Sequence, residues 1–280
     1  MFALFGYIGT PTSLAALPLA TRASVPFIAP FTGAMGLREP MNKNVFHLRA
    51  SYNDETAVIV KQLNTLGLQR IAVFHQNDAY GKAGLDGVTK ALAELNHKPV
   101  AVATVERNSV DVAAAAKLLA VSNADAIVQV SAYKSCAAFI RAAKAAGFGG
   151  QFYNVSFVGT QALSDELGKD AAGVVVTQVV PSPYNMATPI AREFAAALTA
   201  HGKGVKANFS TMEGYLAARM VADGLTRAGA KVSRESFIAG LESIGRSDYG
   251  GFAVALSNKY HVASKFVEKT MLSGDGRVRS

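Results

Sequence analysis

The feature that most constrains the fold of this chain is the repeated alternation of short apolar runs with helix-like patterns. Runs such as Ile71–Phe74, Ala126–Val130 and Gly173–Val180 are apolar at nearly every position rather than at every second one. Strands of this kind are buried on both faces, which happens when helices cover both sides of a parallel sheet. With 280 residues, half of them hydrophobic, the chain is long enough for two such cores. The sequence therefore predicts an α/β fold.

The order of these patterns predicts two lobes that share the chain. Strand–helix alternation restarts at Arg70, and the pattern changes again at the Pro-rich segment 181–183. Three helical patterns then follow one another, at Pro189–His201, Thr211–Gly229 and Arg234–Ile244, before two strand-like pieces at Phe252–Leu256 and Phe266–Leu272. We expect residues 1–67 and 182–263 to form one lobe, and residues 68–181 and 264–280 to form the other.

The common signatures of catalysis are missing from the sequence. It contains no P-loop, no G-x-S-x-G and no H-E-x-x-H motif, and the Gly-rich stretch 147–150 follows a helical pattern instead of opening one. The histidines show no spacing typical of metal ligands: His47, His75, His97, His201 and His261. We therefore expect a protein that is not an enzyme and that needs no cofactor or metal.

Charge and cysteine content exclude further classes. The net charge is +8, but the 28 basic residues are scattered and form no aromatic-rich basic stripe, so we expect no nucleic-acid partner. The single cysteine, Cys136, excludes an intramolecular disulfide, and its apolar neighbours favour burial over reactivity. No apolar run approaches the ~20 residues of a membrane span, so we expect no membrane insertion.

The end of the first apolar run predicts an anion site. Thr10 is a good N-cap and Pro11 suits the first helical position, so the free N–H groups of Thr12 and Ser13 would point to one spot. Such a spot favours a carboxylate or a phosphate. An ordinary capped helix is the alternative explanation of the same residues.

Other strand ends supply hydroxyl and aromatic side chains to a common edge. Because ligands in open parallel sheets bind beyond the carboxyl ends of the strands, we expect these residues to contact a ligand. They carry no obvious acid–base pair, and the set therefore favours binding over turnover. The residues are Phe31, Thr32 and Gly33 after one strand, and Tyr80, Tyr133, Ser156 and Phe157 after later ones.

These segments resemble the solute-binding proteins of bacterial branched-chain amino-acid ABC importers. The resemblance follows the order of the whole chain, in LFGYIGTPTS, VPFIAPFTGA, RIAVFHQNDAYGKAGLDG, ADAIVQVSAY, FYNVSFVG, DYGGFAVALS and HVASKFVEKTMLSGDGR. It implies the type I periplasmic-binding (venus-flytrap) fold, with two Rossmann-like three-layer lobes that close on a small solute. It also implies a periplasmic location and, as partners, the permease and ATPase components of an importer.

The resemblance assigns roles to individual residues. Thr10 falls on the family's carboxylate-binding hydroxyl, and Phe31, Thr32 and Gly33 fall on its second binding loop. Tyr80 falls on an aromatic contact, and a further contact falls on Ala132 or its neighbour Tyr133.

Two departures from the family pattern affect the expected ligand. The hydroxyl residue of the second loop falls on Gly33, with Thr32 one place early. The acidic residue that meets a ligand ammonium falls on Ser156, followed by Phe157. A buried ammonium without a carboxylate partner is costly, so the expected solute is an amino acid or a related organic or aromatic acid, with or without an amine.

A third departure concerns the start of the chain. Compared with the family, roughly two βα units of the first lobe are missing, and a signal peptide with them. We therefore expect the first lobe to be incomplete at its N-terminus.

Two other functions compete with solute delivery. A ligand-sensing regulatory domain of the same fold would be marked by an attached kinase, DNA-binding or membrane segment, and the sequence contains none. An α/β enzyme that uses a nucleotide would need a Gly-rich phosphate loop directly after a strand, which is also missing.

Overall fold

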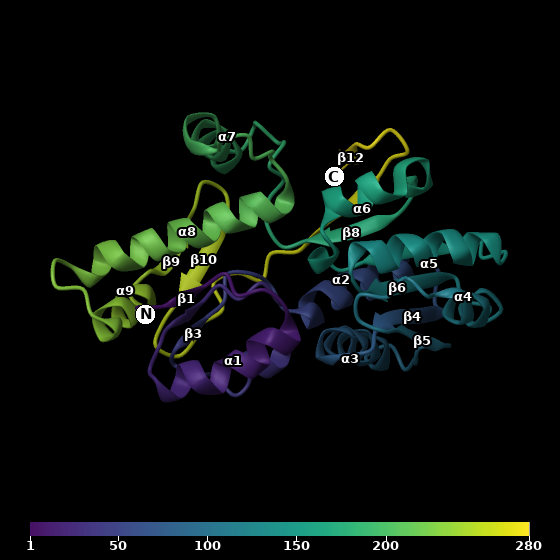
Figure 1. Ribbon diagram of the computed structural model, residues 1–280, viewed down its shortest axis with the longest axis horizontal. Helices are drawn as coiled ribbons and strands as arrows, with labels where there is room; N and C mark the ends of the chain where they lie inside the picture. The colour runs from purple at the N-terminus through teal and green to yellow at the C-terminus, as the bar shows by residue number, and fades with distance from the viewer. Residues whose placement is uncertain (280) are drawn as a thin grey trace. The chain divides into compact units, whose positions relative to one another are not determined.

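The computed structural model describes residues 1–279, and these divide into two compact units. Among these residues the first unit consists of residues 1–51 and 179–266, and the second unit consists of residues 52–178 and 267–279. Figure 1 shows both units, each with strands between helices. The α/β fold class expected from the sequence is confirmed.

The first unit is built on a short parallel sheet with strand order β1-β2-β3. Helix α1 covers one face of this sheet, where Ala20 packs with Phe27 and Val45, and helices α8 and α9 lie on the opposite side (Figure 1). A separate antiparallel hairpin is formed by β9 and β10. The bounds are β1 (Leu4–Phe5), α1 (Thr10–Arg22), β2 (Phe27–Ile28), η1 (Met35–Leu37), β3 (Val45–Phe46), α7 (Pro189–His201), α8 (Phe209–Ala228), α9 (Arg234–Glu242), β9 (Gly245–Asp248) and β10 (Ala253–Leu256).

Within the described residues the second unit contains a seven-stranded sheet with the order β12-β11-β8-β7-β6-β4-β5. Strands β4 to β8 are parallel, and β11 and β12 pair antiparallel at one side. The bounds are α2 (Tyr52–Thr65), β4 (Ile71–Gln76), α3 (Ala79–Ala93), β5 (Val102–Val105), α4 (Ala113–Ala120), β6 (Ala126–Val130), α5 (Tyr133–Ala145), β7 (Gln151–Asn154), η2 (Ser156–Val158), α6 (Thr160–Leu167), η3 (Gly168–Ala171), β8 (Val175–Gln178), β11 (Glu268–Leu272) and β12 (Val278–Arg279).

The apolar strands of this sheet are covered on both faces, as their composition predicts. Ala72 and Phe74 of β4 pack in a core with residues of α4, α5 and α6, while α3 contacts the sheet with α2 beside it. Each residue of β4 is buried, including those that alternate between the two faces. The second unit therefore has three layers, with helices on both sides of the sheet (Figure 1).

The units divide after Ser51, Gln178 and Phe266, whereas the sequence led us to expect divisions after Gly67, Pro181 and Ala263. The two divisions differ most at α2, which packs against α3 in the second unit. Gly87 of α3 brings the helices together, because a methyl group at this position would lie 2.6 Å from the Thr56 hydroxyl oxygen of α2.

Candidate functional site

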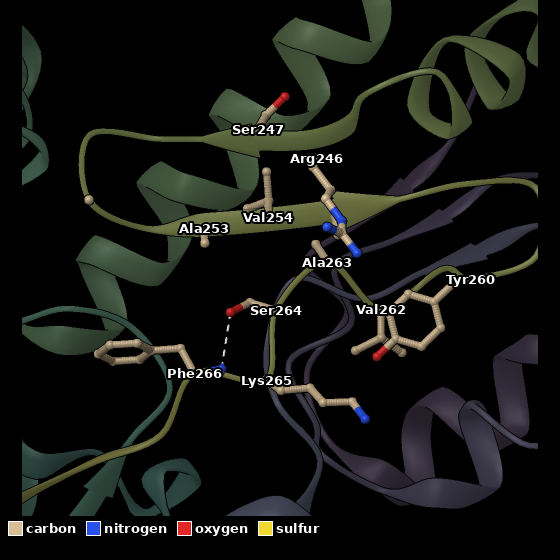
Figure 2. A pocket seen from close by; sticks show the side chains of 12 residues that line it. Arg246, Ser247, Ala253, Val254, Tyr260, Val262, Ala263, Ser264, Lys265 and Phe266 are labelled. Carbon is tan, nitrogen blue, oxygen red and sulfur yellow. Dashed lines mark hydrogen bonds between the residues drawn. The ribbon is translucent and has the colours of Figure 1, made fainter.

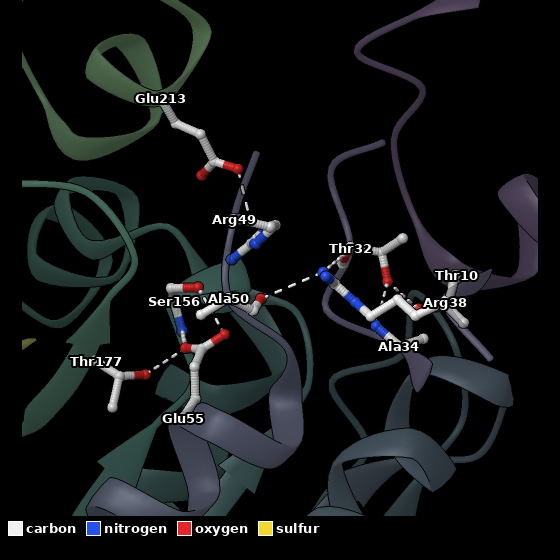
Figure 3. A network of polar contacts seen from close by, with 10 residues as sticks. All are labelled: Thr10, Thr32, Ala34, Arg38, Arg49, Ala50, Glu55, Ser156, Thr177 and Glu213. Carbon is white, nitrogen blue, oxygen red and sulfur yellow. Dashed lines mark hydrogen bonds and ion pairs between the residues drawn. The ribbon is translucent and has the colours of Figure 1, made fainter. Parts of the chain in front are cut away.

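In the first unit, two hydroxyl side chains meet beyond the ends of β1 and β2. A parallel bridge between Ile8 and Phe31 continues the pairing of these strands and brings the residues that follow them together. The hydroxyl oxygens of Thr10 and Thr32 lie 2.6 Å apart, and both side chains are buried (Figure 3). The structure thus joins two residues, Thr10 and Thr32, that the sequence predicts as ligand contacts.

The expected capping of helix α1 by Thr10 is wrong. Gly9 is the N-cap, with φ of 94°, and Thr10 is already the first helical residue. The N-cap position here has a positive φ, which is accessible to glycine and strained for threonine. The cap therefore falls on Gly9, and the helix begins at Thr10, one residue earlier than expected. The N–H of Ser13 is not free either, because it donates to the Gly9 carbonyl at 3.1 Å. Hydroxyl groups, more than helix N–H groups, therefore define this site.

Backbone donors at the second strand end are mostly engaged within the unit. The N–H of Phe31 donates to Tyr7 at 2.8 Å, and that of Thr32 donates to Pro30 at 2.8 Å. Within residues 1–279, the N–H of Gly33 has no such bond, and the Ser13 hydroxyl oxygen is buried without a hydrogen-bond partner. Both groups are donors that a ligand can satisfy.

Two buried arginine side chains contact the segment that contains Phe31 and Thr32. Arg38 donates from Nη2 to the carbonyl oxygens of Thr32 at 3.2 Å and Ala50 at 3.3 Å. The guanidinium carbon of Arg49 lies 4.7 Å from the ring centroid of Phe31, and its Nε is 3.6 Å from a carboxylate oxygen of Glu213. Arg38 therefore contacts the backbone next to the Thr32 hydroxyl, and Arg49 links the ring of Phe31 to Glu213.

In the second unit, the strand order reverses next to β4, whose neighbours are β5 and β6. Ligands of open α/β sheets bind at such a switch point, beyond the carboxyl ends of the strands. Tyr80, two residues into α3 after β4, is 2% exposed. Its ring centroid lies 4.5 Å from that of Phe157 and 5.4 Å from that of Tyr52. These three rings form an aromatic row at this edge.

Asp78 and His75 have structural roles beside this row. Asp78 is the N-cap of α3, and its carboxylate accepts hydrogen bonds from the N–H groups of Tyr80 at 2.9 Å and Gly81 at 3.1 Å. The His75 ring nitrogen Nδ1 lies 2.9 Å from the carbonyl oxygen of Gln76. Asp78 therefore fixes the position of Tyr80 through its backbone.

Two polar residues near the end of β6 differ in their surroundings. Tyr133 begins α5 and packs, partly buried, against the core formed by α4, α5 and α6. Ser131, directly after β6, is fully buried, and its hydroxyl has no hydrogen-bond partner within residues 1–279. The place of Ser131 directly after a buried strand makes it a further candidate beside Tyr133.

Ser156 contacts a carboxylate that the sequence did not reveal. Its N–H donates to Oε2 of Glu55 at 2.7 Å, and its hydroxyl donates to Oε1 at 3.1 Å. The Thr177 hydroxyl also donates to Oε2, at 2.5 Å. Glu55 has no exposed surface, and Figure 3 shows it pointing from α2 toward both residues. An acidic group is therefore present at Ser156, but it comes from another element.

A separate groove of about 600 Å³ lies along β10 in the first unit (Figure 2). Its lining combines Arg246 and Lys265 with small apolar residues such as Ala253, Ala255 and Val262. None of the ligand-binding residues predicted from the sequence lines this groove. It is therefore distinct from the strand-end sites.

The described residues form neither a metal site nor a membrane-spanning helix. Among residues 1–279, no group of three or more His, Cys, Asp or Glu side chains is arranged to hold a metal ion. Over the same residues, no helix has both the length and the apolar character required to cross a membrane.

Comparison with known proteins identifies the family. Residues 1–267 match the model of a family described as periplasmic binding protein. No curated protein matches the chain. A crystal structure described as a possible leucine/isoleucine/valine-binding protein from Rhodopirellula baltica SH 1 is 33% identical, with a TM-score of 0.95 over 100% of this chain and 77% of that chain.

Two further crystal structures are similar to this chain. A substrate-binding periplasmic protein from Ralstonia solanacearum is 29% identical, with a TM-score of 0.92 over 99% of this chain and 80% of that chain. A branched-chain amino acid ABC transporter protein from Thermus thermophilus with bound valine is 18% identical and shares the fold, with a TM-score of 0.83 over 97% of this chain and 75% of that chain.

The matched family and these neighbours are solute-binding proteins and not enzymes, which agrees with the expectation from the sequence. Members of this family are typically periplasmic. The chain therefore belongs to the periplasmic binding protein family and has the fold of its leucine/isoleucine/valine-binding type.

Proposed function

We propose that this protein binds a small solute with a carboxylate group, an amino acid or a related organic or aromatic acid, and delivers it to an ABC importer in the periplasm. The observation that carries this proposal is the buried pair of Thr10 and Thr32 hydroxyls, 2.6 Å apart, with the unpartnered Ser13 hydroxyl on the same turn of α1. Converging hydroxyl donors suit a carboxylate, because hydrogen bonds to a charged acceptor are stronger than those to a neutral one.

The remaining predicted contacts extend the proposed site. Phe31 and Gly33 flank Thr32 in the first unit, and the second unit contributes Tyr80 and Phe157 as an aromatic surface. Tyr133 and Ser156 stay proposed contacts as well, although the side chain of the former packs on the core and that of the latter is held by Glu55.

The carboxylate proposal is tested by replacing Thr10 with Val. A charge-assisted hydrogen bond contributes roughly 1.5–3 kcal/mol, so Thr10→Val should weaken acid binding by about tenfold or more. The probes are L-leucine, 4-methyl-2-oxopentanoate and phenylacetate, each titrated by calorimetry. L-leucinamide and phenylacetamide, the amides of two probes, should bind with affinities that depend much less on Thr10.

Thr21 provides a matched control for this substitution. It lies in the last turn of the same helix, is exposed, and its hydroxyl accepts a hydrogen bond from Asn42. Thr21→Val should leave acid binding unchanged. Equal losses for acid and amide in Thr10→Val, or no loss at all, would show that Thr10 does not hold a carboxylate.

Delivery to an importer is tested with the transporter itself. The family match supports a permease and an ATPase as partners. Solute-loaded protein should stimulate ATP hydrolysis by the cognate importer in proteoliposomes, and Thr10→Val should require a higher acid concentration for the same stimulation. Stimulation that is independent of the acid would contradict the proposal.

A further inference from the structure

Glu55 is a buried carboxylate that the proposed carboxylate site does not use. It lies in the first turn of α2, and it accepts three hydrogen bonds from two other elements. Two of these donors belong to Ser156 at the start of η2, and the third is the hydroxyl of Thr177 near the end of β8. One side chain therefore connects α2, η2 and β8 at the carboxyl edge of the second unit's sheet (Figure 3).

The buried carboxyl group of Glu55 needs hydrogen-bond donors around it. Burying an ionised carboxylate is less favourable than burying an apolar side chain of similar size, unless hydrogen bonds compensate for the lost hydration. Here the compensation comes largely from Ser156, through both its backbone N–H and its hydroxyl. Two hydrogen bonds to the same carboxyl group therefore hold Ser156 in place.

We propose that Glu55 is a positioning residue for solute binding. By holding Ser156, it fixes the ring of the next residue, Phe157, against the ring of Tyr80 at 4.5 Å. A solute at this subsite meets the two rings, while the N–H and hydroxyl of Ser156 remain bonded to Glu55. The inference rests on the proposed function, because Phe157 and Tyr80 are solute contacts only within that proposal.

The test compares Glu55→Ala with the isosteric Glu55→Gln. A Gln carbonyl oxygen at the Oε2 position can still accept from the Ser156 N–H and the Thr177 hydroxyl, and its NH₂ group at the Oε1 position can donate to the Ser156 hydroxyl oxygen. The first measurement needs no solute: it is hydrogen exchange of the segment 155–159, read at the Ser156 amide. Exchange should become about tenfold faster in Glu55→Ala and stay within about threefold of the wild type in Glu55→Gln, because one hydrogen bond to a charged group is lost only in the former.

The second measurement is affinity, by calorimetry on folded protein with L-leucine, 4-methyl-2-oxopentanoate and phenylacetate. Glu55→Ala should weaken all three by about tenfold, and Glu55→Gln should restore most of the affinity. Glu235→Ala is the matched control, because Glu235 also lies in the first turn of a helix but is exposed. It should change neither measurement.

Several outcomes would overturn this role. Unchanged exchange at Ser156 in Glu55→Ala would show that Glu55 does not hold it. If Glu55→Gln loses L-leucine as severely as Glu55→Ala but keeps 4-methyl-2-oxopentanoate, Glu55 contacts the ammonium group directly and positioning is wrong. If Glu55→Ala does not fold, Thr177→Val provides the test, since it removes one bond to Glu55 and should still accelerate Ser156 exchange.

Failure of the carboxylate proposal is distinguishable from failure of this one. If none of the three acids binds the wild-type protein, the proposed function is wrong, and the solute-free exchange experiment alone decides whether Glu55 holds Ser156. If the acids bind and depend on Thr10 but not on Glu55, the carboxylate site stands and the positioning role of Glu55 is overturned.

Discussion

His47 is buried in the first unit beside β3, where its ring nitrogen Nε2 lies 3.1 Å from the carbonyl oxygen of Leu37. Burial lowers its pKa well below the ordinary value, and the nearby charge of Arg38 and the ring of His261 lower it further. The unfolded chain therefore takes up a proton near pH 6.5 that the folded protein does not bind.

This difference predicts a loss of stability in mild acid. As the pH falls below about 6.5, the contribution of His47 should reduce the free energy of unfolding by about 1.4 kcal/mol per pH unit, until the folded-state pKa is reached. Urea unfolding between about pH 7.5 and about pH 5 should show a shallower dependence for His47→Gln than for the wild type. His201→Gln, at the exposed end of α7, is the control, and identical pH profiles for the wild type and His47→Gln would contradict the prediction.

Cys136 should be unreactive in the native protein. It is buried in α5, and burial raises the pKa of its thiol far above the ordinary value. The thiolate is the reactive form, so iodoacetamide at about pH 8 should label the native chain very slowly and label the unfolded chain in concentrated guanidinium chloride readily. Mass spectrometry of the intact chain measures both. Rapid native labelling would mean that α5 opens locally.

At the scale of elements, helix α3 is positioned by glycine. Gly84 faces β6, and a methyl group added there would overlap the side chain of Val130. Gly214, in the middle of α8, has open space around it and an ordinary backbone conformation. The two positions are both helical glycines, yet only the first allows close packing between a helix and the sheet.

Alanine should therefore have opposite effects at the two positions. Gly84→Ala should destabilise the protein by about 1–3 kcal/mol through overpacking. Gly214→Ala should stabilise it by about 0.5–1 kcal/mol, because alanine is the better helix former. Urea unfolding of both variants measures the difference. A neutral Gly84→Ala would show that α3 can shift away from β6 at little cost.

Elements with strong local signals were predictable from the sequence. Helix α7, Pro189–His201, and strand β6, Ala126–Val130, have the expected bounds, because proline suits a helix start and an unbroken apolar run marks a buried strand. Strand β9, Gly245–Asp248, was not predicted, since its sequence Gly-Arg-Ser-Asp lacks apolar alternation and the strand exists through its pairing with β10.

The candidate site was predictable only where it follows strand ends. Thr10 and Thr32 each follow a parallel strand within a few residues, and parallel strands place their carboxyl ends together. Glu55 follows no strand. An acidic residue in the first turn of a helix is ordinary, because it interacts favourably with the helix dipole, so nothing local distinguishes a buried carboxylate from an exposed one.

At the scale of the whole molecule, the chain returns to complete a sheet it began earlier. Strand β11 pairs with β8 in the order Glu268 to Met271 against Gln178 to Val175. Buried groups fix this pairing: the Gln178 amide donates to the Thr270 hydroxyl at 2.8 Å, and Leu272 is buried. The second unit therefore depends on a segment that follows the first unit's residues in the sequence.

Removing this segment should damage the second unit. A chain that ends after Phe266 leaves the buried strand β8 as an open edge, and it loses about 1.5–3 kcal/mol for the burial of Leu272 alone. We expect aggregation in size-exclusion chromatography and a lower unfolding midpoint in urea. A chain that ends after Ser273 keeps β11 and should remain monodisperse. Equal behaviour of the two would show that β11 contributes little.

Because β11 follows β8 by many residues in the sequence, the sheet of the second unit stays incomplete for some time during synthesis. The ribosome must add all of residues 179–266 after finishing β8 and before it makes β11. At roughly 5–20 residues per second, this interval lasts roughly 4–18 seconds, which is very long compared with the microseconds in which a hairpin forms. Throughout it, the nascent sheet exposes an apolar strand with unpaired backbone groups. For those seconds the growing chain is a natural client for a holding chaperone, and it reaches its native topology only after translation has passed β11.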